Sequence, residues 1–451
     1  MQNLILKYNK AIPRYTSYPT APEWSNDLTP TDYSVALKSL NKTEDVALYI
    51  HLPFCKSLCN YCGCHVIIRA SNDKAQPYLD QLEKEIELAA FHLGSKRKVK
   101  QIHFGGGSPS FVSGEQFEHL MNQIFSKFDV IENAEIAIEA DPRTVSDEKL
   151  ELYRSLRFNR ISFGVQDLNE NVQIEINRIQ SVELIDSLVK KCRELGFKSV
   201  NLDLIYGLPK QTVENFQYTV NEIIKINPDR IALFGYAHIP WIKKHQNKMA
   251  ESDLPEPNEK LAIFLKSREL FMEAGYAPIG MDHFAKPDDE LAKAFNEKYL
   301  YRNFMGYAVE NIQNIIGFGI SSIGKIGDAF FQNVKTLKEY ESHIENSILP
   351  IDRGMILSKD DILRQYVILC LMCQFELDKD HIEEKFGIDF DDYFSLELED
   401  LPDLMIDGLL EVDNRKIHVT QLGRFFVRNI ANVFDIYYRN QVKKHRFSQS
   451  V

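Results

Sequence analysis

Four cysteines lie close together early in the chain, in the run HLPFCKSLCNYCGC. They are Cys55, Cys59, Cys62 and Cys64, so the first three follow a Cys-x3-Cys-x2-Cys spacing and the fourth comes two residues later. The apolar residues 46–50 just before them are typical of a β-strand. Thiolates this closely spaced, in a chain with only seven cysteines, are most often metal ligands. The sequence therefore predicts a metal centre at the end of a strand.

The spacing distinguishes between two kinds of metal centre. A structural zinc site usually takes four ligands in two Cys-x2–4-Cys pairs with a longer spacer between them. Here all four cysteines belong to one loop and no second pair follows nearby. Three thiolates can hold three irons of a four-iron cluster and leave the last iron open, so we favour an iron–sulfur cluster. Cys192 lies alone in a helical pattern, and we expect Cys370 and Cys373, one helical turn apart in a hydrophobic helix, to be core thiols.

Composition argues against several classes of protein. The net charge of −12 is unlike the basic surface that nucleic-acid binding needs. No run approaches the eighteen apolar residues of a membrane span, and the first twenty residues lack the apolar core of a secretory signal. The clustered cysteines do not resemble a disulfide framework, which favours a reducing, cytoplasmic location.

Six short β-rich runs recur through the first half of the chain, at 46–51, 100–104, 135–139, 160–164, 199–205 and 230–235. Most of the gaps between them carry a helical pattern, as in 77–93 and 183–197. Alternating strands and helices predict right-handed βαβ units and a parallel sheet. We therefore expect an α/β fold whose six units form an incomplete, TIM-like barrel.

Residues that can bind or react gather where these runs end. The four cysteines follow the first run, and the later runs are followed or closed by Gly105, Gly106, Gly107, Ser108, Glu139, Gln166, Asp167, Asp203, Tyr236, Ala237 and His238. In parallel α/β folds the ligand site lies at the carboxyl ends of the strands. The pattern predicts one site assembled from six strands.

Taken singly, most of these residues carry a weak signal. The turn at 105–109, GGGSP, lacks the lysine of a P-loop, and it is as well explained by a tight turn as by a ligand cradle. Glu139 and Asp203 suit ribose hydroxyls or an amine, and Arg178 suits a carboxylate. Each could instead be structural, and the same applies to the four histidines near the site, His51, His103, His238 and His283.

The two ends of the chain differ from its centre. Beyond residue 352 a hydrophobic helix, two short strands and another helix suggest a small, mostly helical, winged-helix-like domain; its acidic run at 397–404 argues against DNA binding. We expect an N-terminal arm over 1–35, a catalytic partial barrel over 36–351 and a C-terminal domain over 352–451. The aromatic and proline-rich stretch of the arm either covers the site or is simply solvated.

Longer strings resemble a known family. The cysteine spacing and the GGGSP turn resemble the radical S-adenosylmethionine (SAM) enzymes. Nearly the whole chain resembles the oxygen-independent coproporphyrinogen III oxidases among them, on the strings PRYTSYPTA, CGC, NRISFGVQDLNENVQ, INR, DLIYGLP, GYAHIPW, GMDHFAKPDDELA and YRNFMGY.

The resemblance implies a reaction and its cofactors. Cys55, Cys59 and Cys62 would hold a 4Fe–4S cluster, and SAM bound at the open iron would give a 5′-deoxyadenosyl radical on reduction. The radical takes a hydrogen atom from a propionate of coproporphyrinogen III; carbon dioxide and an electron leave, and a vinyl group remains. Two propionates react in this way, giving protoporphyrinogen IX in haem biosynthesis. No catalytic residue is expected beyond the cofactor ligands.

The resemblance also implies two SAM molecules. Residues matching the first SAM site are Tyr49, Gly106, Glu139 and Ile323. Residues matching the second are Tyr61, Gly107, Ser108, Gln166, Arg178, Asp203 and Ala237. The family often has Thr at the position of Ser108 and Phe at that of Tyr61; the hydroxyl and the ring are kept. Cys64 is expected outside the cluster's ligand set.

The expected partners follow from the same resemblance. The porphyrinogen's carboxylates need cations, for which Arg14, Arg143, Arg178 and Arg302 are candidates. A low-potential donor such as flavodoxin or ferredoxin would supply electrons to what we expect is a monomer. The alternative is a haem-binding, chaperone-like paralogue of the oxidases. That family typically has an aromatic residue where Cys64 stands and lacks the PRYTSYPTA arm, so both features favour the oxidase.

Overall fold

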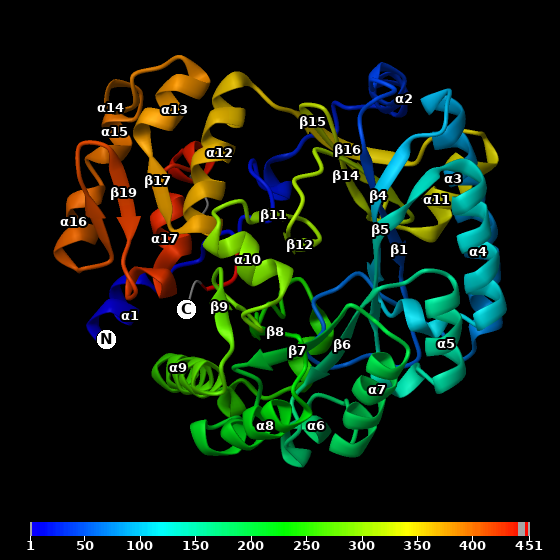
Figure 1. Ribbon diagram of the computed structural model, residues 1–451, viewed down its shortest axis with the longest axis horizontal. Helices are drawn as coiled ribbons and strands as arrows, with labels where there is room; N and C mark the ends of the chain where they lie inside the picture. The colour runs from blue at the N-terminus through cyan, green and yellow to red at the C-terminus, as the bar shows by residue number, and fades with distance from the viewer. Residues whose placement is uncertain (1, 441–446, 450–451) are drawn as a thin grey trace.

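The computed structural model describes residues 2–440 and 447–449 (Figure 1). Within these residues one large sheet of twelve strands forms the centre, in the order β16-β15-β14-β13-β1-β4-β5-β6-β7-β8-β10-β9. Its strands are β1 Val46–Leu52, β4 Lys98–Gly106, β5 Asp129–Ala140, β6 Arg160–Gln166, β7 Ser199–Tyr206, β8 Arg230–Gly235, β9 Ala277–Ile279, β10 His283–Ala285, β13 Asn314–Phe318, β14 Ile323–Ile326, β15 Ala329–Asn333 and β16 Ile351–Ile356.

The six predicted strands are β1 and β4 to β8, and they pair in parallel in the order of the chain. The predicted incomplete α/β barrel is therefore confirmed, but the parallel part is one strand wider. Strand β13 pairs in parallel with β1, with Val46 opposite Asn314. The outer strands β14–β16 and β10–β9 are antiparallel.

The glycine-rich stretch at 317–323 is a turn over 319–322 with a strand on either side of it. Strand β13 ends at Phe318 and β14 begins at Ile323. A Cβ atom on Gly317 would lie 2.8 Å from the Ile323 carbonyl oxygen, and one on Gly324 would lie 2.6 Å from that of Ile315. The glycines thus serve close backbone approach between paired strands, which the sequence does not distinguish from a turn.

Helices cover the outer face of the parallel strands (Figure 1). They are α3 Gln76–Leu93, α4 Gly114–Lys127, α5 Asp147–Ser155, α6 Glu170–Glu175, α7 Val182–Glu194, α8 Val213–Ile226 and α9 Pro257–Glu273. Capping boxes start α4 at Ser113 and α8 at Thr212, and Gly196, at φ +75°, follows the end of α7. The two helices predicted from periodicity, 77–93 and 183–197, are α3 and α7.

Alternation along the strands sends two kinds of side chain to opposite faces. Leu48, Ile102 and Phe104 are fully buried in the core under the helices. Tyr49 and His103, which lie opposite each other on β1 and β4, belong to the other face, toward the barrel interior. The side chains that face the barrel interior are polar, so this face of the sheet can form a binding site.

The C-terminal part has its own core. Helix α12, Lys359–Gln374, packs with α17, Val427–Asn432, and a small sheet joins β17 Glu376–Asp378 to the hairpin β18 Leu410–Val412 and β19 Lys416–Val419. Figure 1 shows these elements at the opposite end of the molecule from α3 and α4. Cys373 is a core thiol as predicted, whereas Cys370 is only partly buried; Cys192 is buried as well.

The N-terminal arm runs between the barrel and this C-terminal part. Tyr15 and Tyr18 are buried, and the Tyr15 hydroxyl donates to Asp435 at 3.0 Å. Tyr18 accepts a hydrogen bond from the backbone N–H of Ile436. Arg14 donates to the carbonyl of Gly235 at the end of β8, 2.7 Å away. In the described residues, no helix is both long and apolar enough to cross a membrane.

Candidate active site

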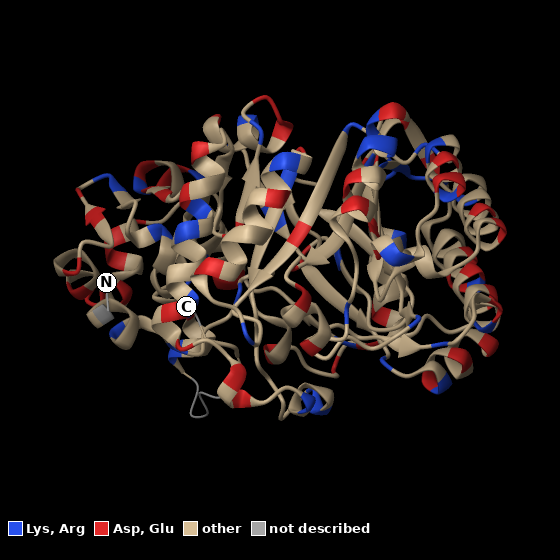
Figure 2. Cartoon of the chain, turned by 90° about the horizontal axis from the view of Figure 1, so that it is seen from below, with Lys and Arg blue, Asp and Glu red and all other residues tan. Residues whose placement is uncertain are grey.

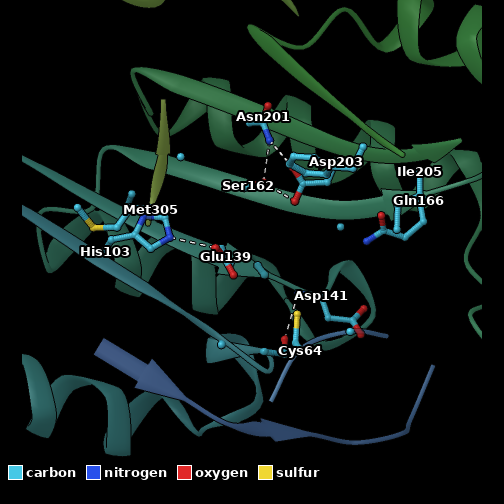
Figure 3. A pocket seen from close by; sticks show the side chains of 18 of the residues that line it. Cys64, His103, Glu139, Asp141, Ser162, Gln166, Asn201, Asp203, Ile205 and Met305 are labelled. Atoms are coloured by element: carbon cyan, nitrogen blue, oxygen red, sulfur yellow. Dashed lines mark hydrogen bonds and ion pairs between the residues drawn. The ribbon is translucent and has the colours of Figure 1, made fainter. Parts of the chain in front are cut away.

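A cavity of about 550 Å³ opens at the carboxyl ends of the parallel strands. Figure 3 shows side chains from several strands turned toward it. Of the residues predicted for the site, it is lined by Cys55, Cys59, Cys62, Tyr61, Gly106, Gly107, Ser108, Glu139, Gln166, Arg178, Asp203 and Ala237. The topology thus brings twelve of the fourteen predicted residues to one hollow.

The two remaining residues, Tyr49 and Ile323, line a neighbouring cavity of about 580 Å³. Gly106 and Glu139 line both cavities. The residues matched to a first SAM therefore all border the neighbouring cavity. Those matched to a second SAM all border the cavity of about 550 Å³, which is called the large cavity below because many more residues line it. Cys64 also borders both.

The three cysteines of the Cys-x3-Cys-x2-Cys run share one wall of the large cavity. Nη1 of Arg178 lies 3.7 Å from Sγ of Cys59. Within the described residues, no three side chains of His, Cys, Asp or Glu converge as ligands of a single ion would. A four-iron cube spreads its thiolates over separate corners, so three thiols along one cavity wall fit such a cluster with one iron left for a ligand.

The thiols differ in their electrostatics. A hydrogen bond from Cys64 lowers the pKa of the Cys62 thiol to about 6, and the same contact raises the pKa of Cys64. Burial raises the pKa of Cys55 to about 12. In this chain the Cys64 thiol therefore lies beside that of Cys62 in the predicted cluster loop.

The glycine turn after β4 is shaped by two close approaches. A Cβ atom on Gly107 would lie 2.5 Å from the carbonyl carbon and oxygen of Pro53. Gly106 has φ +117°, and a Cβ there would lie 2.7 Å from the His51 ring. The backbone N–H of Gly107 donates to Leu52, the last residue of β1. Glycine is thus required for the turn to lie against the cysteine loop, and the bare backbone faces the cavity.

Glu139, at the end of β5, is held by His103 from β4. Nε2 of His103 lies 3.0 Å from Oε1 of Glu139 (Figure 3). Burial opposes ionisation of this carboxyl, but the hydrogen bond from His103 and the N–H of Gly106 lower its pKa overall. The site therefore presents an oriented carboxylate between the two cavities.

Asp203, on β7, is another acidic group that lines the large cavity. Its Oδ2 accepts from Ser162 at 3.0 Å and its Oδ1 accepts from the Asn201 amide at 2.7 Å. Burial, and then the negative charge of Glu139, raise the pKa of Asp203 to about 6. The residue is a fixed hydrogen-bonding group that titrates near neutrality.

Gln166 ends β6 in an unusual conformation. Its φ is +69°, and the pairing with β7 shifts register between Gly164 and Gln166. Its Oε1 is buried and has no hydrogen-bond partner among the described residues. Backbone strain and an unpartnered acceptor at a cavity wall mark a place where a ligand is expected.

Arg178 is already engaged with the protein. It contacts Asp141 at 3.1 Å and donates to the carbonyl of Gly164 at 2.6 Å. Asp141 also pairs with Arg143 at 2.7 Å. Arg143 lines neither cavity, whereas Arg14 and Arg302 line the large one.

The four histidines and Asp167 differ in whether they line a cavity. His103 and His283 line the large cavity and His51 the neighbouring one, while His238 lines neither. Asp167 is fully buried and accepts from Gln211 and Thr219, both at 2.6 Å, so it is a structural residue rather than a site residue.

Sequence reasoning missed several lining residues. Ser162 and Asn201 orient Asp203, and Asp141 links two arginines. The hairpin of β11, Tyr301–Asn303, and β12, Gly306–Ala308, also lines the large cavity. The string YRNFMGY covers this hairpin, and of its residues only Arg302 was expected at the site.

Comparisons with known proteins agree with this geometry. Residues 49–223 match the Radical SAM superfamily, and residues 357–426 match the HemN C-terminal domain. The chain is 44% identical to oxygen-independent coproporphyrinogen III oxidase of Synechocystis sp., covering 99% of this chain and 97% of that protein. It is also 44% identical to the Escherichia coli protein of the same name, over 99% and 98% of the two chains.

A solved structure gives the same picture. The crystallised coproporphyrinogen III oxidase (HemN) from Escherichia coli, described as a radical SAM enzyme, has a TM-score of 0.91 and 42% identity to this chain. The match covers 96% of this chain and 98% of the other. The likeness therefore includes the barrel, the hairpin and the C-terminal part together.

Proposed function

The chain belongs to the oxygen-independent coproporphyrinogen III oxidases of the radical SAM superfamily, and on that premise we propose how its residues carry the reaction. The family activity is the oxidative decarboxylation of two propionates of coproporphyrinogen III to vinyl groups, which gives protoporphyrinogen IX for haem synthesis. A 4Fe–4S cluster and SAM are the cofactors of this superfamily. The single observation that carries the assignment to this chain is the cavity where the three cysteines meet the glycine turn and Glu139.

The protein's share in the chemistry is binding and orientation. Cys55, Cys59 and Cys62 would hold the cluster. The cluster and SAM, when bound, would supply the radical chemistry that removes a hydrogen atom from a propionate, with carbon dioxide released and one electron passed to an acceptor. The barrel interior and the elements around its mouth keep water from the reacting carbon.

Two SAM molecules suit the two cavities. Tyr49, Gly106, Glu139 and Ile323 serve the first, in the neighbouring cavity, with Glu139 held by His103 for an amine or hydroxyl. The second, in the large cavity, is served by Tyr61, Gly107, Ser108, Gln166, Arg178, Asp203 and Ala237. The unpartnered Oε1 of Gln166 supports this role because it offers an acceptor at the cavity wall.

The three segments of the chain divide the work. The arm, 1–35, covers the site: Arg14 lines the large cavity while Tyr15 and Tyr18 fix the arm to the C-terminal part. Residues 36–351 form the catalytic partial barrel. Residues 352–451 form the C-terminal domain, which supports the arm.

The remaining partners are an electron donor and the substrate. A low-potential protein such as flavodoxin or ferredoxin reduces the cluster, and the enzyme works as a cytoplasmic monomer. All seven cysteines are free, which suits a reducing compartment. Figure 2 shows acidic and basic residues interspersed over the outer helices, with no extended basic face in this view.

Anaerobic reconstitution tests the proposal. The protein is loaded with iron and sulfide and incubated with coproporphyrinogen III, SAM and a chemical reductant, and the porphyrins are analysed by mass spectrometry. Protoporphyrinogen IX and SAM cleavage that both require substrate and reductant support the oxidase. Tight haem binding without conversion of the porphyrinogen would instead identify the chaperone-like alternative.

A further inference from the structure

Four arginines were candidates for the carboxylates of the substrate, and their surroundings differ. Arg143 and Arg178 both pair with Asp141, and Arg14 donates to the Gly235 carbonyl. Arg302, on β11, lines the large cavity and is only 5% exposed. Its Nε and Nη1 are buried with no hydrogen-bond partner among the described residues.

Buried guanidinium donors without acceptors destabilise the fold, because folding removes their hydrogen bonds to water and no protein hydrogen bond replaces them. Such a group in a native structure calls for a partner that is not part of the protein, such as a water molecule, an ion or a ligand. Arg97, which is 1% exposed, also has an unpartnered Nε, but both of its terminal nitrogens donate to the protein, to the backbone carbonyls of Leu40, Leu93 and Ser95. Arg302 therefore has the signature of a binding residue and Arg97 that of a structural one.

The neighbours of Arg302 position it without neutralising it. Its guanidinium carbon lies 4.4 Å from the ring centroid of Tyr307, the residue opposite it in the hairpin. Tyr307 is anchored in turn, since its hydroxyl accepts from the N–H of Met281 and donates to the carbonyl of Met372 on α12. Against the effect of burial, the negative charge of Asp282 acts on Arg302 and raises its pKa, but the Asp282 carboxylate itself is paired with His283 at 2.7 Å.

Room for an anion exists only on one side of this arginine. Arg302 also lines a space of about 20 Å³ beside Tyr18, which has room for little more than a water molecule. The large cavity, at about 550 Å³, can admit a carboxylate carried by a bulky ligand.

We propose that Arg302 is a carboxylate-binding residue of the active site and that it holds a propionate of the porphyrinogen. The proposal rests on the proposed function and adds to it the residue that recognises the substrate's acidic side chains. A guanidinium fork binds a carboxylate bidentately, so it fixes the propionate's orientation as well as its charge. SAM also carries a carboxylate, and the experiment separates the two sources.

The test compares Arg302→Met, Arg302→Lys and the control Arg97→Met in reconstituted protein. Coproporphyrin III, the stable oxidised form of the substrate, is titrated by its fluorescence, and SAM is titrated separately. We expect Arg302→Met to weaken coproporphyrin III binding about tenfold or more and Arg302→Lys to weaken it less, with SAM affinity unchanged. The unfolding midpoint of Arg302→Met should not fall, since two of its nitrogens have no partner to lose, whereas that of Arg97→Met should.

Unchanged porphyrin binding by Arg302→Met would overturn the inference. A loss confined to SAM would overturn it as well, by assigning the carboxylate to the cofactor. Turnover of coproporphyrinogen III by the unaltered enzyme is measured in parallel. If the unaltered enzyme converts the substrate but Arg302→Met binds porphyrin normally, the inference fails while the proposed function stands.

Discussion

Nε2 of His103 lies 3.0 Å from Oε1 of Glu139, and the two residues come from adjacent parallel strands, β4 and β5. The contact fixes the one carboxylate that borders both cavities. It also lowers the pKa of Glu139 against the effect of burial. The orientation of Glu139 is thus set by His103, which lies on the neighbouring strand.

Replacing His103 tests this contact. In His103→Phe the ring that lies alongside Tyr49 is kept, but the hydrogen bond to Glu139 is lost. We expect the dissociation constant for SAM to rise about tenfold, because a charge-assisted hydrogen bond no longer orients the carboxylate. Isothermal titration measures it. His119→Phe, which removes an exposed histidine paired with Glu83 on the outer helices, should leave SAM binding unchanged.

Cys62 and Cys64 form a matched pair for the cluster. We expect Cys62→Ala to abolish the cluster and all turnover, because it removes one of three ligands. Cys64→Ser should keep a cluster, since Cys64 lies beyond the three-ligand set although it touches Cys62. Iron and sulfide analysis after reconstitution provides the readout. Turnover by Cys62→Ala, or a colourless Cys64→Ser protein, would contradict the ligand assignment.

The glycine turn predicts a sharp contrast between two alanine variants. In Gly107→Ala the new Cβ meets the Pro53 carbonyl at 2.5 Å, so backbone must move and we expect a loss of about 1–3 kcal/mol in the free energy of unfolding. Gly63→Ala, in the cysteine loop, has nothing within 4 Å of its Cβ and should change stability by less than about 0.5 kcal/mol. Chemical denaturation of both variants checks this. Equal stability would show that the turn tolerates a side chain.

Asp203 predicts a pH dependence of stability. Its pKa is about 6 in the folded chain, above the ordinary value of 3.8, so near pH 5 the folded chain binds a proton that the unfolded chain has released. The free energy of unfolding therefore falls as pH rises from about 4 to about 6, and this single group accounts for up to about 3 kcal/mol.

Asp203→Asn removes that titration while keeping partners for Ser162 and Asn201. Relative to the unaltered chain, the variant should gain stability between about pH 4 and about pH 7. Denaturant unfolding at both pH values measures the difference. The exposed Asp27→Asn serves as control and should show no such gain; parallel pH profiles for all three proteins would refute the assignment to Asp203.

Much of this architecture was predictable because its signals are local. Each of the six central strands is a short apolar run, and the chain order of their ends placed the cysteines, the glycine turn and Glu139 on one rim. The family strings then named the cofactor positions. Strand β13 was not predictable in the same way, because its partner β1 is distant in sequence and glycines 317 and 324 look like turn residues.

The details of the site depend on contacts that no local pattern encodes. The sequence does not indicate that Asp141 forms ion pairs with both Arg143 and Arg178, because the three residues come together only through folding. It also could not separate Asp167, buried against Gln211, from its neighbour Gln166 at the cavity wall. At the end of a bulged strand, adjacent side chains point into different surroundings. The backbone conformation decides which of them faces the core and which faces the cavity.

The wall shared by the two cavities has a consequence for how such a protein can change over generations. Gly106 and Glu139 border both hollows. A substitution at either position alters two pockets in one event, so neither pocket can drift toward a new ligand while the other stays as it was. The two cavities are therefore constrained to evolve together at these positions. A new ligand specificity is more readily selected through residues that border only one cavity.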